Sequence, residues 1–379
     1  MKFSISLIFA AVLIVFNVHY TRAQHKHHTD SDKRPGKVMR DTIRAKHKNR
    51  NDMPMKHDMG KMSDSMGGMH HDQQPMKMTG QQDSMPGMHM AMSHSFSLNL
   101  PMSRNGSGTS WLPDASPMYG LMEHNGPWMY MFHGNVAPRY IITDISEKGA
   151  RGDKKFSLPN WFMAMGQRRI GENGLFHFNA MVSLDRFTEG GDGYPLLFQT
   201  GESWKDQPLV DKQHPHDLFS ELSLSYTHSL STKADLSLYL GYPGEPALGS
   251  AAFMHRPSSL ANPDAPISHH WNDGTHITFG VATLGFRYDK VKLEFSSFTG
   301  REPDEDRVAF DRPRFDSYSS RLQYNPTENW AFQLSQGWVN SPESLHPGED
   351  VHRTIASAIY SIKMADEHYF NATALWGSE

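Results

Sequence analysis

The chain from residue 126 onward alternates apolar and polar residues in short runs. Between Phe176 and Asp185, phenylalanine, alanine, valine and leucine take every second position, and mostly polar residues take the positions between them. A period of two is that of a β-strand with one apolar side and one polar side. Such runs predict eleven strands, at about 127–142, 160–170, 175–185, 217–229, 233–243, 275–288, 291–299, 315–324, 329–338, 352–363 and 367–376.

The links between these strands alternate strictly between short and long. Short links lie at 171–174, 231–232, 289–290, 325–328 and 365–367, and long ones at about 186–216, 243–274, 300–314 and 339–351. Aromatic residues cluster at the strand ends. Both features are typical of an antiparallel transmembrane barrel of the bacterial outer membrane. A soluble β-sandwich, the alternative, shows alternating faces without requiring this alternation of links.

The strand count is odd, whereas single-chain bacterial barrels usually have an even number of strands. We therefore predict about 12 strands over 126–379, with a C-terminal strand missing after Glu379. The alternative is a strand wrongly split or merged near Ala137, Pro138 and Arg139.

The first 125 residues differ in composition from the rest of the chain. Residues 1–23 combine Lys2, an apolar run and small residues before Gln24, which predicts an export signal peptide. Residues 24–95 form a polar tail rich in histidine, lysine and methionine, predicted to be disordered in the periplasm because the tail lacks apolar residues for a core. Residues 96–125 are a bridge rich in proline, glycine and serine.

The tail carries the most distinctive chemistry. Half of the 24 methionines lie between Met53 and Met92, and the chain has no cysteine. Thioethers favour Cu(I), and imidazole also suits copper. We predict a site for Cu(I) or Ag(I); the alternatives are flexible apolar filling or biased disorder without function. The predicted tail ligands are Met59, Met62, Met66, Met69, His70, His71, Met76, Met78, Met85, Met88, His89, Met90, Met92 and His94.

A second candidate lies in the first predicted strand. Alternation turns Met129, Met131 and His133 toward the lumen and Trp128, Tyr130 and Phe132 toward lipid. The three inward side chains are candidate metal ligands that would extend the ligand set of the tail into the barrel. The alternative is that they are apolar filling of a small barrel. The facing of Met163 and Met165 in the next strand is undecided.

A third candidate is a set of loop histidines at the opposite mouth. His214 and His216 lie in one long loop, and His269 and His270 lie in the next. The predicted topology places both loops on one side. Structural hydrogen bonding is favoured over a metal site, because histidine serves both roles in ordinary loops.

The order of signal peptide, Met/His-rich tail and barrel resembles that of the copper-resistance protein B family. The elements Met59–Met62, Met66–Met69 and Met88–Met90 carry the resemblance. It implies copper binding and a part in periplasmic copper tolerance. The segments GTSWLPDASPMYG, QHPHDLF, AFMHRP and HHWNDGTHITFG resemble an uncharacterised group of bacterial outer-membrane proteins that occurs in metal-resistance settings.

These patterns predict an outer-membrane barrel whose tail captures copper for sequestration or tolerance. The expected partners are outer-membrane lipid, metal ions and periplasmic copper proteins, with no nucleic acid and no organic cofactor. The alternative is a general porin or structural barrel with an incidental tail. We expect no enzyme, because the G-x-S-x-G, H-E-x-x-H and P-loop motifs are absent.

Overall fold

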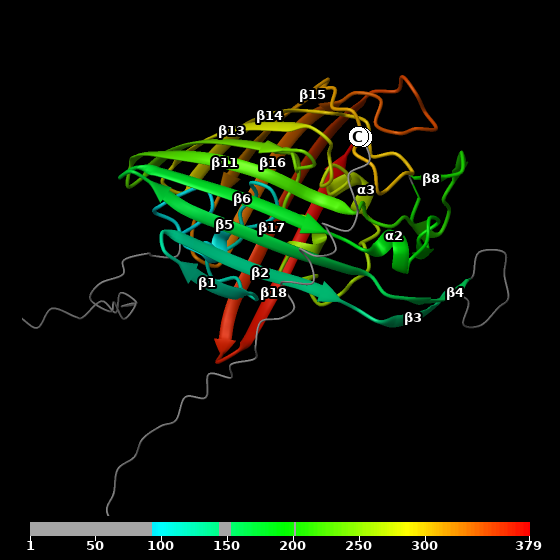
Figure 1. The fold of residues 1–379 in the computed structure, drawn as a ribbon, viewed down its shortest axis with the longest axis horizontal. Helices are drawn as coiled ribbons and strands as arrows, with labels where there is room; N and C mark the ends of the chain where they lie inside the picture. The colour runs from blue at the N-terminus through cyan, green and yellow to red at the C-terminus, as the bar shows by residue number, and fades with distance from the viewer. Residues whose placement is uncertain (1–92, 144–152, 201) are drawn as a thin grey trace, which may run out of the picture. The chain divides into compact units, whose positions relative to one another are not determined.

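The computed structural model describes residues 93–143, 153–200 and 202–379, and its main element is one antiparallel sheet of twelve strands (Figure 1). Neighbouring strands of the sheet follow one another along the chain, as in a meander. The strands are β1 (Leu121–Asn125), β2 (Trp128–Val136), β5 (Asn160–Ile170), β6 (Gly174–Val182), β11 (Phe219–Ser231), β12 (Ala234–Gly241), β13 (Val281–Tyr288), β14 (Val291–Phe298), β15 (Ser317–Tyr324), β16 (Trp330–Val339), β17 (Val351–Ala365) and β18 (His368–Ser378). Within the described residues β1 pairs with β2 alone and β18 with β17 alone, so these strands are the sheet edges.

The remaining elements are short and lie mostly in the long links. Three two-stranded sheets join β3 (Arg139–Ile142) to β4 (Lys154–Ser157), β7 (Tyr194–Pro195) to β10 (Lys212–Gln213), and β8 (Ser203–Trp204) to β9 (Gln207–Pro208). Single helical turns are η1 (Met102–Arg104), α2 (Asp185–Thr188), η2 (Phe253–His255) and α3 (His269–Asn272). Figure 1 shows α2, β3, β4 and β8 at one end of the sheet. No helix in the described ranges is long and apolar enough to cross a membrane.

The antiparallel all-β fold predicted from the period of two is confirmed, and each of the eleven predicted ranges contains a strand of the sheet. The range 127–142 holds both β2 and β3, which belong to different sheets. The twelfth strand, β1, comes from residues predicted as a bridge. With β1 the sheet has twelve strands, the number predicted.

The two faces of the sheet are reversed relative to a soluble protein. On β11, Ser223, Ser225 and Thr227 are buried, whereas Leu224 and Tyr226 are 53% and 43% exposed. The same order holds along β12 to β16, where leucine and phenylalanine face outward. Polar side chains thus line the concave interior and apolar ones cover the outside. The predicted alternation is confirmed.

Residues 93–116 fill much of this interior (blue to cyan in Figure 1). The Trp111 backbone N–H donates to Oε1 of Gln323 at 2.6 Å, and the Ala115 N–H donates to the carbonyl of Glu328 at 2.8 Å. The loop after β12 also enters the interior, where the Gly249 N–H donates to Oγ of Ser335 at 2.9 Å. The predicted bridge is therefore an interior segment followed by β1.

Charged side chains inside the sheet neutralise one another. The Arg321 guanidinium lies 3.0 Å from the Glu294 carboxylate, and the Lys292 ammonium lies 3.1 Å from it. Arg287 pairs with Asp235 at 2.6 Å. The pairs Arg321–Glu294 and Arg287–Asp235 each join two neighbouring strands, whereas Lys292 and Glu294 both lie on β14. Buried charges are tolerated when they are partnered in this way.

Candidate metal centre

The inward faces of β2, β5 and β6 carry a grid of soft donor side chains. The register places His133 opposite Met163, and Met163 opposite Met181. Met131 lies opposite Met165 in the next inward row. Directly opposite residues have Cβ atoms about 4.5–5.5 Å apart, so thioethers and imidazole of one row are within mutual reach.

Two further methionines join these strands from the interior segment and the loop after β12. Met102 of η1 and Met254 of η2 belong to the same buried cluster as Met129 and Met131. All seven methionines of the cluster are at most 9% exposed. The cluster also contains Trp161, Phe253 and Ala265. It therefore packs the interior as well as concentrating sulfur there.

His133 is the nitrogen donor at this cluster. Its Nε2 lies 2.8 Å from Sδ of Met163. Its ring lies against Trp161 and His255, with centroids 5.2 Å and 5.7 Å away. An imidazole nitrogen and a thioether sulfur directed at each other are the two ligand types that Cu(I) accepts from a cysteine-free chain.

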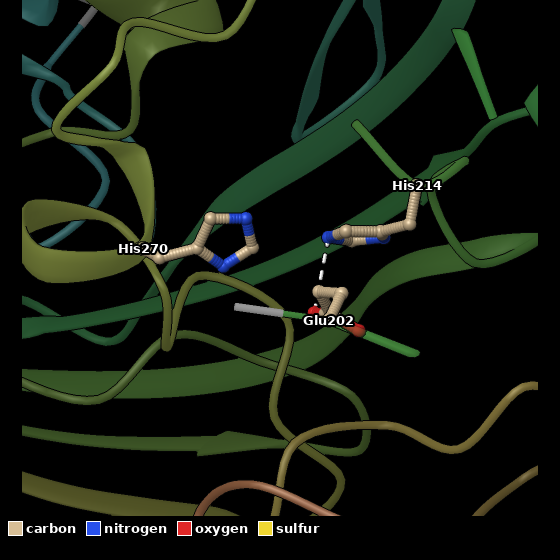
Figure 2. A group of neighbouring side chains, drawn as sticks. All are labelled: Glu202, His214 and His270. Atoms are coloured by element: carbon tan, nitrogen blue, oxygen red, sulfur yellow. Dashed lines mark ion pairs between the residues drawn. The ribbon is translucent and has the colours of Figure 1, made fainter. Parts of the chain in front are cut away.

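A second group of ligands gathers in the long loops. Glu202 precedes β8, His214 follows β10, and His270 belongs to α3. One donor atom from each residue lies within 4.8 Å of the other two. Figure 2 shows the two imidazole rings and the carboxylate turned toward one space. Nε2 of His214 is 3.1 Å from Oε1 of Glu202.

The electrostatics of this group favour neutral imidazoles. Burial lowers the pKa of His214 well below its usual value, and the nearby Arg307 guanidinium adds to this. Burial also lowers the pKa of His270, although the nearby Glu202 acts in the opposite direction. Burial, followed by repulsion from Glu202, raises the pKa of Glu302 well above its usual value.

Three more histidine rings continue from this group into the protein. His269 lies 5.3 Å from His270 and 5.0 Å from His276 between ring centroids, and His276 lies 5.6 Å from His216. His216 Nδ1 contacts Asp185 at 2.7 Å. Its Nε2, like Nε2 of His276, is buried without a hydrogen-bond partner among the described residues.

The histidine row approaches the methionine cluster. His216, Phe253, Met254 and Trp161 all line one small cavity of about 20 Å³. Phe253 lies between the two regions, 5.1 Å from the ring of His269. The loop donors and the soft interior donors therefore belong to adjacent parts of one interior.

The predicted ligands are distributed over three places. Those from Met59 to Met92 lie outside the described residues. His94 is fully buried, and its Nδ1 accepts the Phe96 backbone N–H at 2.9 Å. This leaves the proton of a neutral His94 ring on Nε2, so ligation by His94 would require the other tautomer. Met129 and Met131 face inward as predicted, and His133 contacts the same cluster.

The sequence missed several members of these sites. Glu202 lies in an irregular link about 70 residues before His270, with no periodic signal to single it out. Met181 was not predicted as a ligand, and Met102 was taken as part of the bridge. The strand register across 171–174 would have revealed Met181 and Met163 as neighbours.

No family model matches the chain, and no curated protein matches it significantly.

Proposed function

We propose that the protein is an outer-membrane β-barrel that binds Cu(I) or Ag(I) and contributes to copper sequestration or tolerance. The observation that carries the proposal is the row formed by His133, Met163 and Met181 across three adjacent strands. The predicted tail supplies the same donor types earlier in the sequence. Thioethers need no deprotonation before binding and do not oxidise to disulfides, so both donor sets suit an oxidising compartment.

The reversed faces of the sheet support insertion in a membrane. Leucine and phenylalanine on the outside of β11 to β16 would meet hydrocarbon, and serine, threonine and charged residues would be sheltered inside. A soluble monomer rarely exposes a continuous apolar surface of this kind. The interior segment 93–116 argues against the alternative of an open general porin, because it occupies the space a wide pore needs.

Leu238→Arg tests the membrane assignment. Leu238 lies mid-strand on β12, 44% exposed on the outer face. In lipid vesicles we expect the free energy of unfolding to fall by about 2–4 kcal/mol, because the arginine would sit in hydrocarbon. Leu230→Arg, near the end of β11, should lose about 0–1 kcal/mol. Equal, small losses at both positions would contradict a membrane-spanning sheet.

Replacing Met131, Met163 and Met181 together by leucine tests the interior copper site. Each exchange roughly conserves volume, so the fold should persist. In competition with a Cu(I) chelator, we expect the triple variant to lose at least one equivalent of bound Cu(I). Met364→Leu, at a position 72% exposed, is the control and should bind as the parent does. Unchanged binding by the triple variant would refute the interior site.

Deleting residues 53–92 separates the contribution of the tail. Loss of most Cu(I) equivalents together with increased copper sensitivity of the host is expected if the tail captures the metal. Unchanged sensitivity would favour the structural-barrel alternative. The deletion and the triple methionine variant should have additive losses, because the two donor sets do not share residues.

A further inference from the structure

We propose that Glu202, His214 and His270 form a binding site for a borderline divalent cation, of which Zn²⁺ is the representative. This site lies in the long loops and contains no sulfur, so it goes beyond the soft-metal function proposed above. The two ideas stand on different residues and different metals. Either can fail without the other.

The spacing of the donors fits a single ion. Zinc binds imidazole nitrogen at about 2.0–2.1 Å and carboxylate oxygen at about 2.0–2.2 Å. Ligand atoms around a tetrahedral zinc therefore lie roughly 3.4 Å apart. His214 and Glu202 already have donor atoms 3.1 Å apart, and the donor of His270 lies within 4.8 Å of both. A side-chain shift of about 1 Å would close the set.

The hydrogen bonds of His214 point to a cation between it and Glu202. Nδ1 of His214 lies 3.0 Å from the carbonyl oxygen of Pro215, so this nitrogen must carry the proton. A neutral ring then turns the lone pair of Nε2 toward the Glu202 carboxylate. Two acceptors facing each other at 3.1 Å repel unless a proton or a metal ion lies between them.

The groups around the donors resemble the outer shell of known metal sites. The Pro215 carbonyl fixes the His214 tautomer that ligation requires, as carbonyls do for metal-binding histidines. Arg307 donates to the other carboxylate oxygen of Glu202 at 3.0 Å and holds that side chain in place. Arg307 also pairs with Asp217 at 3.2 Å, which offsets its positive charge near the ion.

A cavity borders the site on the side of Glu202, and the donor set leaves one coordination position free. Glu202 lines a cavity of about 580 Å³ together with Ser203, Arg301 and Glu302. Three protein ligands leave a fourth tetrahedral position for water or an anion. Two imidazoles and a carboxylate suit Zn²⁺ or Cu²⁺, whereas Cu(I) favours the thioethers of the methionine cluster.

The test is the Zn²⁺-dependent stability of the full chain in detergent. Ions that bind the native fold more tightly than the unfolded chain raise the unfolding midpoint. We expect Zn²⁺ to raise the midpoint of the parent protein, and His270→Gln and Glu202→Gln each to abolish most of that rise. His346→Gln is the control, because His346 is an exposed loop histidine with 58% of its side chain accessible.

Two further measurements distinguish this site from the methionine cluster. The triple methionine variant should keep the full Zn²⁺ response, and His270→Gln should keep the Cu(I) equivalents of the parent. If Glu202→Gln fails to fold because Arg307 loses its partner, His214→Gln replaces it. The proposal is overturned if Zn²⁺ leaves the parent midpoint unchanged, or if the rise persists in His270→Gln and in the second site variant.

Discussion

Replacing Arg321 by methionine is expected to lower the free energy of unfolding by about 3–5 kcal/mol. The Arg321 side chain is fully buried and donates to Glu294 at 3.0 Å, to the Gly249 carbonyl at 3.0 Å and to Thr109 Oγ1 at 2.7 Å. The substitution would leave these three buried acceptors without the hydrogen bonds that Arg321 donates. Because Lys292 still lies 3.1 Å from Glu294, we expect the lower part of this range.

Urea unfolding in lipid vesicles, followed by tryptophan fluorescence, would measure this loss. Lys233→Met, in the exposed turn between β11 and β12, is the control and should change stability by less than about 0.5 kcal/mol. Adding Glu294→Gln to Arg321→Met should increase the loss, because it leaves the buried Lys292 ammonium without its carboxylate partner. A loss below about 1 kcal/mol for Arg321→Met would show that the buried network does not stabilise the sheet.

Trp111→Ala is expected to cost about 3–5 kcal/mol. The Trp111 ring is 3% exposed and lies between two cations, with the Arg104 guanidinium 4.8 Å and the Lys292 ammonium 5.0 Å from its centroid. The substitution removes the largest side chain of the interior segment together with both cation–π contacts. It would leave Lys292 beside a cavity, and we expect the segment to detach before the sheet unfolds.

The same unfolding assay applies, with Trp271→Ala as the matched control. Trp271 is 59% exposed on α3, so its removal should change stability by less than about 1 kcal/mol. Limited proteolysis between residues 93 and 116 would reveal detachment of the segment in Trp111→Ala. Equal losses at the two tryptophans would mean that the interior segment contributes no specific packing.

Both predictions follow from a sheet that has its apolar side outside. The outward apolar side chains of such a sheet do not pack its interior. The interior depends on buried apolar clusters, on paired charges and on the segment 93–116, which supplies backbone groups and the Trp111 ring. Arg321 joins β15 to β14, to the loop after β12 and to the interior segment through its separate donors.

The sequence alone predicted the strands because their signal is local. A strand alternates its side chains at every residue, so Ser223, Leu224 and Ser225 already give the inward and outward faces. Met129 and Met131 were assigned inward by the same rule, and the burial of both side chains agrees. The short turns are also a local feature of the sequence. Because a short turn joins two antiparallel neighbours, the turns predicted which strands pair.

The candidate sites depended on contacts between distant residues. Glu202, His214 and His270 come from separate loops, and only the folded sheet brings those loops to one place. Periodicity carries no information on irregular segments, so Glu202 could not be distinguished from other loop carboxylates.

The sequence by itself determined an antiparallel sheet with a polar inward face, and it placed soft donors on the first long strand. Only the tertiary structure decided that residues 93–116 enter the interior, that β1 completes the twelve strands, and that Met163 and Met181 align with His133. The physical reason is range: alternation is set by bonded neighbours, whereas register and loop docking are set by contacts across the whole sheet.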